Sequence, residues 1–494
     1  MAARRNVLLI TVDQWRGECL SVAGHPVVRT PALDALAAEG ARFTRHYAQA
    51  APCGPSRASL HTGQYLMKHR SVLNGTPLDA RFTNLALEAR AAGHDPVLFG
   101  YTDASPDPRM LATDDPRLRS YEGVLPGYRA VVDLPEHLEA WGAWLRTQGY
   151  DVPADVRDLY TPVSDEPRAP VPYRAEHTEA AFLTGEILDH VDAADGSWFV
   201  HAAYIRPHPP FVAPEPYNTM YDPDSVPPPV RAGTVEAESA VHPVVAGALA
   251  IPGVRLGDDE DELRRTRATY YGMMSEVDAQ LGRLFAGLRE RGQWDETLVV
   301  LTSDHGEQLG DHWLTEKLGW FDQSYFIPLI VRDPDRPDAA GTVVDRFTEN
   351  VDVMPTVLEW LGLPVPVQCD GRSVLALAHG EPVGQWRDAA FWEWEFRDPI
   401  GGWAESMLGL TMDQCGVSVL RDEHGKYVHF TGLPPLFYDL DDDPHELVDR
   451  AGDPAYAATV LTYAQRMLSH RMEHVEQTLT GLMVTPVGVL DGRR

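Results

Sequence analysis

Asn6-Val7-Leu8-Leu9-Ile10-Thr11-Val12 is a continuous apolar run near the start of the chain. Such a run, without alternation of polar residues, is typical of a strand that is buried on both faces of a sheet. The segment Thr297-Leu298-Val299-Val300-Leu301-Thr302 repeats the pattern far downstream. We therefore predict that both segments are central strands.

Helical patterns alternate with the predicted strands. Thr30-Pro31 offers an N-cap followed by proline at the first helical position, and Gly40 offers a C-terminal stop. Further helices are expected at 85–92, 178–191 and 264–291, and further strands at 96–99 and 198–204. This alternation predicts an α/β fold with a mostly parallel, mixed central sheet flanked by helices.

The pattern changes after Pro366. Short segments at 389–394, 416–421 and 426–430 are typical of antiparallel strands, and a final helix is expected over 456–478. We predict a catalytic α/β domain at 1–366 and a smaller α+β domain at 367–494. Proline-rich stretches at 160–172, 206–216 and 223–229 are expected to be loops over the sheet.

Charge and cysteine content limit the classes of function. The formal net charge is −31, from 42 Lys and Arg against 73 Asp and Glu. Such a surface repels nucleic acid and anionic membranes, so we expect neither as a partner. Four cysteines are too few for a disulfide framework, and the first apolar run is too short for a signal peptide or a membrane span. The sequence therefore predicts a cytoplasmic protein.

Polar side chains follow both central strands directly. Asp13 and Gln14 come after the first strand, and Asp304 and His305 follow the strand that ends at Thr302. Ligands of open α/β sheets bind beyond the carboxyl ends of strands, so these four side chains should converge. A single Asp after a strand is usually a turn residue. Two such pairs, with carboxylate, amide and imidazole groups, favour a site for one divalent metal ion.

Cys53 lies in the run Ala51-Pro52-Cys53-Gly54-Pro55-Ser56-Arg57-Ala58-Ser59-Leu60-His61-Thr62-Gly63. A lone cysteine is most often a small buried apolar residue. A thiolate phosphatase would need its arginine one residue further along. The run resembles the sulfatase signature, in which the cysteine is oxidised to formylglycine before folding completes. This resemblance implies that Cys53 supplies the nucleophile, as one hydroxyl of the hydrated aldehyde, and contacts the metal.

A second motif extends the resemblance over about residues 5 to 365. Val300-Leu301-Thr302-Ser303-Asp304-His305-Gly306-Glu307 with Gly310-Asp311-His312 is similar to the second sulfatase signature, and Lys317 follows at the family's usual interval. Most sulfatases have Asp in place of Gln14 and Asn in place of His305. The pairs found here resemble those of phosphonate monoester hydrolases and choline sulfatases. An alkaline-phosphatase-like fold is implied.

Two further segments resemble the phosphonate monoester hydrolases in particular. They are residues 65–79 and Gly100-Tyr101-Thr102-Asp103, the latter followed by Pro106-Asp107-Pro108-Arg109. The nitrogen ligand His305 weakens the case for Ca²⁺, which prefers oxygen ligands. Mn²⁺ is therefore the first choice of metal and Ca²⁺ the second.

The resemblance also implies catalytic and substrate-binding roles. Arg57 would hold the hydrated aldehyde or the substrate anion, and Lys317 would be a cation near the leaving oxygen. His208 follows a predicted strand and is a candidate leaving-group acid, although a His among prolines also suits a packed loop. Asp103 would repel a substrate anion unless it faces a cation. Substrate contacts are expected from Asn74, Tyr101 and, with less support, Thr102.

These observations predict a metal-dependent formylglycine hydrolase that cleaves phosphonate monoesters, phosphodiesters and sulfate monoesters through a covalent hemiacetal-ester intermediate. Three alternatives stay open: a dedicated arylsulfatase or choline sulfatase, a phosphatase with Ser56 as nucleophile, and an unmodified, inactive binding relative. The expected partners are a small anionic ester and a formylglycine-generating enzyme or equivalent maturase. The apolar segment 483–494 and the resemblance suggest a homo-oligomer, a dimer or tetramer.

Overall fold

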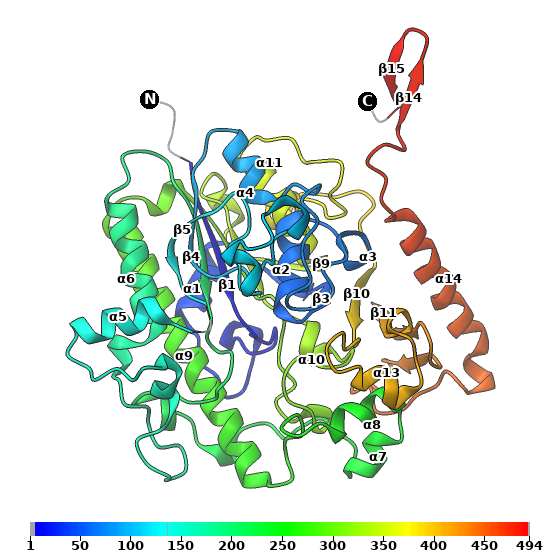
Figure 1. Cartoon of the computed structure of the whole chain (residues 1–494), viewed down its shortest axis with the longest axis horizontal. Helices are drawn as coiled ribbons and strands as arrows, with labels where there is room; N and C mark the ends of the chain where they lie inside the picture. The colour runs from blue at the N-terminus through cyan, green and yellow to red at the C-terminus, as the bar shows by residue number, and fades with distance from the viewer. Residues whose placement is uncertain (1–4, 136, 493–494) are drawn as a thin grey trace.

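The computed structural model describes residues 5–135 and 137–492, and its centre is an eight-stranded sheet (Figure 1). The strand order is β5-β4-β6-β1-β7-β8-β2-β9. Only β8 runs antiparallel to its neighbours β7 and β2. The predicted mostly parallel, mixed sheet is therefore confirmed. Its strands are β1 (Asn6–Val12), β2 (Ala41–Tyr47), β4 (Pro96–Gly100), β5 (Arg129–Asp133), β6 (Phe199–Tyr204), β7 (Thr297–Thr302), β8 (Leu329–Arg332) and β9 (Thr342–Glu349).

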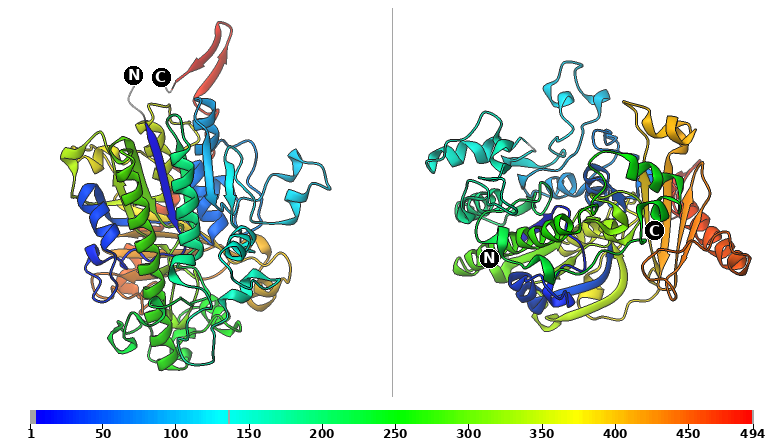
Figure 2. Two further views of the ribbon diagram at one scale, coloured as in Figure 1. Left: turned by 90° about the vertical axis from the view of Figure 1, so that its left-hand side faces the viewer. Right: turned by 90° about the horizontal axis from the view of Figure 1, so that it is seen from below.

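Helices cover both faces of this sheet, as Figures 1 and 2 show. On one face Leu8 and Ile10 of β1 pack in a core with α1 (Pro31–Glu39), α6 (Glu179–Asp192) and α9 (Glu260–Glu290). On the other face Val7 and Leu9 pack with α2 (Cys53–Thr62), α4 (Leu85–Ala91) and α11 (Val353–Trp360). Burial on both faces explains the continuous apolar run of β1.

A second sheet lies beside the first, in the order β13-β12-β11-β10-β3. Three of its late strands match the predicted antiparallel segments: β10 (Ala389–Glu395), β11 (Gly416–Asp422) and β12 (Gly425–Phe430). A fourth antiparallel strand, β13 (Leu436–Asp439), was not predicted. The fifth strand, β3 (Ala50–Ala51), comes from just before Cys53 and pairs in parallel with β10. The domain boundary at 366/367 stays a prediction, since both parts of the chain contribute to this sheet.

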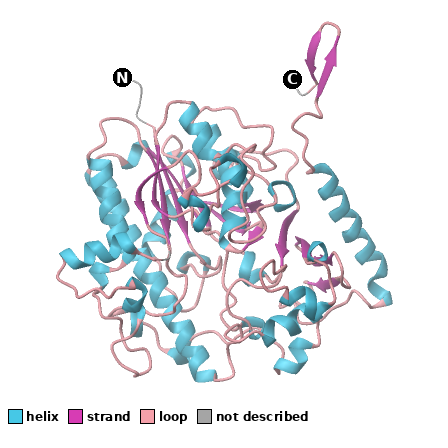
Figure 3. Ribbon diagram, in the orientation of Figure 1, coloured by secondary structure: helices cyan, strands magenta, loops and turns pink. Residues whose placement is uncertain are grey.

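The chain ends in a helix and a hairpin. Helix α14 (Ala457–Glu473) packs against β11 and β12 and ends five residues before the predicted end at 478. The hairpin of β14 (Leu482–Thr485) and β15 (Gly488–Asp491) projects away from the body (Figures 1 and 3).

Two further findings concern the predictions from composition. Within the described residues, no helix combines the length and the apolar character that a bilayer crossing requires. All four cysteines are free thiols, and Cys53 is buried. Residues 1–4, which precede the first apolar run, lie outside the described residues.

Candidate active site

The predicted site residues gather where parallel strands end. Strands β4, β6, β1 and β7 are adjacent and parallel, so their carboxyl ends share one edge of the sheet. Asp13 directly follows β1, Tyr101 directly follows β4, and Asp304 lies two residues beyond β7. His208 lies in the loop after β6. The topology thus explains why distant segments meet at this edge.

Cys53 is the first residue of α2, and Arg57 lies one turn further along. The Arg57 guanidinium donates from Nη2 to Asp13 Oδ2 at 3.0 Å and from Nε to Asp304 Oδ2 at 3.0 Å. Its Nη1 donates to the Tyr101 carbonyl at 3.1 Å, and all of these groups are buried. Charge-assisted bonds of this kind fix the relative position of the two carboxylates. The predicted contact of Arg57 with a substrate anion stays a prediction, because its donors are directed to the protein.

Four side chains bring one ligand atom each into a tight cluster. The ligand atoms of Asp13, Cys53, Asp304 and His305 all lie within 4.8 Å of one another. Cys53 Sγ is 3.1 Å from His305 Nε2, and His305 Nδ1 lies 2.9 Å from the Gly306 carbonyl. The carbonyl can only accept, so Nδ1 carries the proton and Nε2 turns its lone pair to the cluster.

The donor set fits a divalent cation. Asp13 Oδ1 is buried and has no hydrogen-bond partner among the described residues, although it lies 3.7 Å from His305 Nε2. A buried, unpaired carboxylate oxygen is costly unless a cation meets it. Carboxylate oxygens with one imidazole nitrogen are suitable ligands for Mn²⁺ and related ions.

Gln14 is oriented differently from the four clustered side chains. Its Oε1 accepts from Lys317 Nζ at 3.0 Å, and its Nε2 donates to Glu307. The backbone at Gln14 has a φ of 65°, in the left-handed region. Its predicted role as a metal ligand stays a prediction, and the structure shows it positioning Lys317.

Burial and charge set the protonation of the cluster. Burial alone would raise the pKa of Asp13, but its electrostatic interactions with His208, His305, Arg57 and Lys317 outweigh burial and lower the pKa below its ordinary value. Burial and the nearby Asp13 carboxylate raise the pKa of the Cys53 thiol well above its ordinary value. An unmodified Cys53 is therefore a neutral thiol and a poor nucleophile.

A small cleft of about 70 Å³ opens onto the cluster. Its lining contains six residues of the predicted site, Asp13, Cys53, Asn74, Tyr101, His208 and Lys317, together with Asp103. Thr102 is not part of it, since its hydroxyl donates to the Gly123 carbonyl at 2.9 Å and accepts from the Leu125 N–H at 2.8 Å. Tyr121 and Glu122 also line the cleft. We did not predict them, because their loop carries no motif.

Lys317 and His208 form a pair at the cleft. Lys317 Nζ lies 3.3 Å from His208 Nε2, and His208 Nδ1 lies 2.9 Å from the Pro209 carbonyl. Nδ1 therefore carries the proton, and Nε2 accepts from Lys317. Burial and the charge of Lys317 lower the pKa of His208, so the imidazole is neutral. In this arrangement the proton shared by the pair lies on Lys317. The predicted role of His208 as leaving-group acid stays a prediction.

Nearby acids complete the electrostatics of the cleft. Burial would lower the pKa of Lys317, but its electrostatic interactions with Cys53 and Glu316 raise it, and Glu316 Oε2 lies 3.1 Å from Nζ. Burial raises the pKa of Asp103 to about 7, against the lowering effect of Arg57. Near neutral pH Asp103 therefore exists partly as the neutral acid, which can donate a hydrogen bond to an anion.

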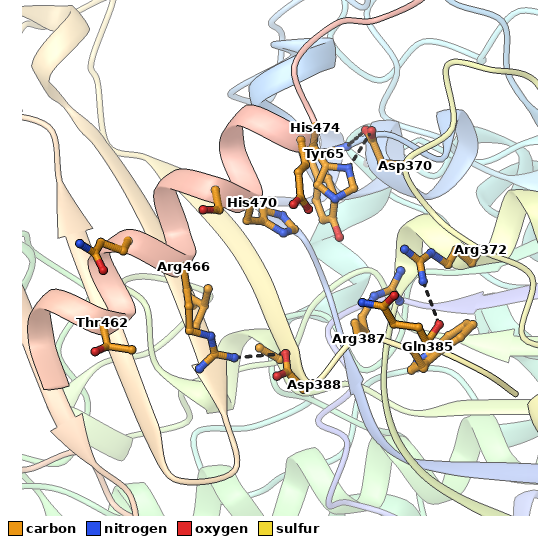
Figure 4. A pocket seen from close by; sticks show the side chains of 16 residues that line it. Tyr65, Asp370, Arg372, Gln385, Arg387, Asp388, Thr462, Arg466, His470 and His474 are labelled. Atoms are coloured by element: carbon orange, nitrogen blue, oxygen red, sulfur yellow. Dashed lines mark hydrogen bonds and ion pairs between the residues drawn. The ribbon is translucent and has the colours of Figure 1, made fainter. Parts of the chain in front are cut away.

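A larger cleft of about 530 Å³ lies elsewhere, between α14 and the segment before β10 (Figure 4). Two pairs of its charged groups lie close to one another. Arg466 Nη2 lies 3.1 Å from Asp388, and His474 Nδ1 lies 3.2 Å from Asp370. It contains none of the predicted site residues. We name it the α14 cleft and do not assign the reaction to it.

A cysteine at a helix start, facing carboxylate and imidazole donors at the edge of a parallel sheet, defines a sulfatase-type hydrolase site. The chain belongs to the sulfatase family: the model of that family matches residues 5–363, and the model described as N-sulphoglucosamine sulphohydrolase, C-terminal, matches 310–474. The predicted family and its alkaline-phosphatase-like fold are thus confirmed.

Similar proteins cover nearly the whole chain. It is 44% identical to the multifunctional alkaline phosphatase superfamily protein PehA of Trinickia caryophylli, over 98% of this chain and 99% of that protein. It is 48% identical to the phosphonate monoester hydrolase of Agrobacterium radiobacter, with a TM-score of 0.96 over 99% of both chains. The phosphonate monoester hydrolase SpPMH of Silicibacter pomeroyi is 40% identical, with a TM-score of 0.94 over 99% of this chain and 100% of that chain.

Proposed function

We propose that the protein hydrolyses monoanionic esters of phosphorus and sulfur at the Cys53 cleft, with phosphonate monoesters and phosphodiesters preferred over sulfate monoesters. The observation that carries this proposal is the cluster of Asp13, Cys53, Asp304 and His305 within 4.8 Å. Support for the order of preference comes from the similarity to two phosphonate monoester hydrolases over almost the full chain.

The family uses formylglycine and a divalent metal, and both fit this site. Asp13, Asp304 and His305 would hold the cation, with Mn²⁺ as first choice and Ca²⁺ as second because His305 supplies nitrogen. When bound, these groups supply a hydroxyl nucleophile and the positive charge that binds the ester's oxygens.

The side chains around them hold and orient the substrate. Lys317 donates its proton toward the leaving oxygen, and His208 accepts from Lys317 and keeps it in place. Asn74 Oδ1 accepts from the Gly54 N–H at 2.8 Å, so its NH₂ group is left to donate to a substrate oxygen. Asp103 donates while it is protonated. Several donors preorganised around one anion are typical of such catalysis.

We propose a maturase as an obligatory partner. Cys53 is only 4% exposed, at the start of a helix packed into the sheet. An enzyme that oxidises it, of the formylglycine-generating kind, would need access before the chain has folded. Co-expression with and without such an enzyme tests this, and we expect catalytic activity only in its presence.

We also propose that the chain forms a homo-oligomer through its C-terminal hairpin. Val484 and Val487 of this hairpin are 85% and 88% exposed. A two-stranded hairpin is marginally stable alone, and exposed apolar side chains gathered on it mark an interface. Deletion from residue 482 onward should reduce the mass measured by light scattering to that of one chain. Residues 493–494, part of the predicted segment, lie outside the described residues.

Steady-state kinetics test the main proposal. The kcat/KM of one Mn²⁺-loaded sample is measured with three substrates: nitrophenyl sulfate, a phenylphosphonate monoester and the phosphodiester bis(nitrophenyl) phosphate. We expect turnover of all three, with the highest kcat/KM for the phosphonate ester. Turnover of the sulfate alone would support a dedicated arylsulfatase, and turnover of none would support a binding protein.

A further inference from the structure

An apolar cavity of about 500 Å³ lies beside the Cys53 cleft. Three elements build it: α8 (Pro243–Ala250), the end of β10, and the short helix α13 (Trp403–Leu408). Helices α8 and α13 pack on each other and lie side by side in Figure 1. We call this cavity the apolar pocket. Its walls include Val244, Ala248, Trp394, Phe396, Trp403 and Met407.

The apolar pocket and the Cys53 cleft share a wall. Lys317 lines both of them. Pro52 and Leu73 line the apolar pocket, and their chain neighbours Cys53 and Asn74 line the cleft. The two spaces therefore adjoin, with Lys317 at the junction.

The sizes of the two spaces differ in a way that suits an ester. The cleft of about 70 Å³ has room for the anionic head group but for little more. The pocket of about 500 Å³ lies within the ~300–1,000 Å³ range of small-molecule sites. Lys317 faces the leaving oxygen in the proposed function. The alcohol attached to that oxygen would then extend past Lys317 into the apolar pocket.

The chemistry of the walls selects an apolar alcohol. The charged groups of the pocket already have partners within the protein. Arg397 Nη2 lies 2.7 Å from Glu395, Lys317 lies 3.1 Å from Glu316, and Asp398 accepts from the Trp403 N–H at 3.0 Å. Trp403 and Met407 are each 42% exposed at the wall. Large apolar side chains exposed around a cavity mark a site for an apolar group.

We propose that the apolar pocket binds the leaving alcohol of the substrate, and that this alcohol is aromatic or branched aliphatic and uncharged. This inference rests on the proposed function. It names the side of the ester that determines specificity, and it assigns Ala248 and Trp403 as residues that select the leaving group.

The test uses methylphosphonate monoesters of three alcohols: ethanol, phenol and 2-naphthol. For the wild-type holoenzyme we expect kcat/KM to rise about tenfold from phenyl to naphthyl, two alcohols of similar acidity. Ala248→Phe fills the pocket and should remove this rise. Trp403→Ala removes an exposed wall and should reduce the rise without disturbing the buried core. Ala250→Phe, at an exposed position of the same helix, is the matched control and should keep the rise.

The outcomes separate the inference from the function it rests on. If the wild-type holoenzyme turned over none of the three esters, the proposed function would be overturned. Turnover of all three esters with an equal naphthyl-to-phenyl ratio in the wild type and Ala248→Phe would overturn the inference alone. So would dissociation of an oligomer by Ala248→Phe, because another copy of the chain would then fill the pocket.

Discussion

Two arginines in this protein each bridge two buried carboxylates, and the difference between them distinguishes a reactive site from a structural ion pair. Arg57 joins Asp13 and Asp304 at the Cys53 cleft. Arg387, at the α14 cleft, joins Glu349 and Asp352.

Around Arg387, all four carboxylate oxygens have donors. Glu349 accepts from the Tyr65 hydroxyl at 2.6 Å and from the Phe391 N–H at 2.7 Å, and both oxygens of Asp352 accept from backbone N–H groups as well as from Arg387. At the Cys53 cleft, Asp13 Oδ1 lacks a partner among the described residues. The unmet acceptor, and not the ion pair, marks the reactive site.

The largest expected effect comes from substitution of Cys53, with Cys369 as the matched control. Cys53→Ala should lower kcat by at least about 10⁴-fold on every ester, because the nucleophile is lost. Cys369→Ala, near the α14 cleft, should keep the wild-type kcat. Steady-state assays on a phosphonate ester measure both. Full turnover in Cys53→Ala, together with loss in Ser56→Ala, would show that Ser56 is the nucleophile.

A second comparison uses one acid from each bridge. Asp13→Asn should lower the affinity for the divalent metal by more than about 100-fold, because a ligand oxygen with no other partner is replaced. Asp352→Asn should leave metal content unchanged and lower the melting temperature, because its oxygens accept only protein donors. Elemental analysis and thermal unfolding measure the two quantities. Equal metal loss in both variants would show that the unpaired oxygen of Asp13 does not distinguish a metal ligand from a structural acid.

Lys317→Met tests which group protonates the leaving oxygen. We expect kcat to fall about 10²-fold for esters of poorly acidic alcohols and much less for nitrophenyl esters, since nitrophenolate leaves without a proton. His208→Gln should have the smaller effect, because Gln can still accept from Lys317. A larger loss in His208→Gln would reassign the acid to His208.

The smallest effect concerns the acid at position 103. Asp103 is neutral below its pKa of about 7 and is a carboxylate above it, so it repels an anionic substrate only at the higher pH. We expect kcat/KM to fall a few-fold as the pH rises through this pKa, and a bound cation would move the fall to lower pH. Asp103→Asn should remove this fall. An unchanged pH profile in the variant would show that Asp103 does not face the substrate.

Much of the fold was predictable because burial of a strand requires apolar residues, and these form a recognisable run in the sequence. Strands β1 and β7 are apolar throughout, and their ends match the prediction. Strand β2 was missed, since Arg42, Thr44 and Arg45 interrupt its apolar positions. Its neighbours β8 and β9 were missed too, and with them the antiparallel pairing of β8.

The site was predictable where a motif or a strand end carried it, as for Asp13, Cys53 and Asp304. Side-chain directions were not, because they depend on partners far along the chain. Thr102 faces Gly123 and Leu125, and Gln14 faces Lys317. The apolar pocket is lined by residues of α8 and α13. No local sequence pattern indicates that these two segments lie together.

The most direct measurement is mass spectrometry of the peptide that contains residue 53, from active protein made in its native host. The proposed chemistry requires the mass of formylglycine at this position, in an amount that scales with specific activity across preparations. A fully active protein with only an unmodified Cys53 thiol would contradict it.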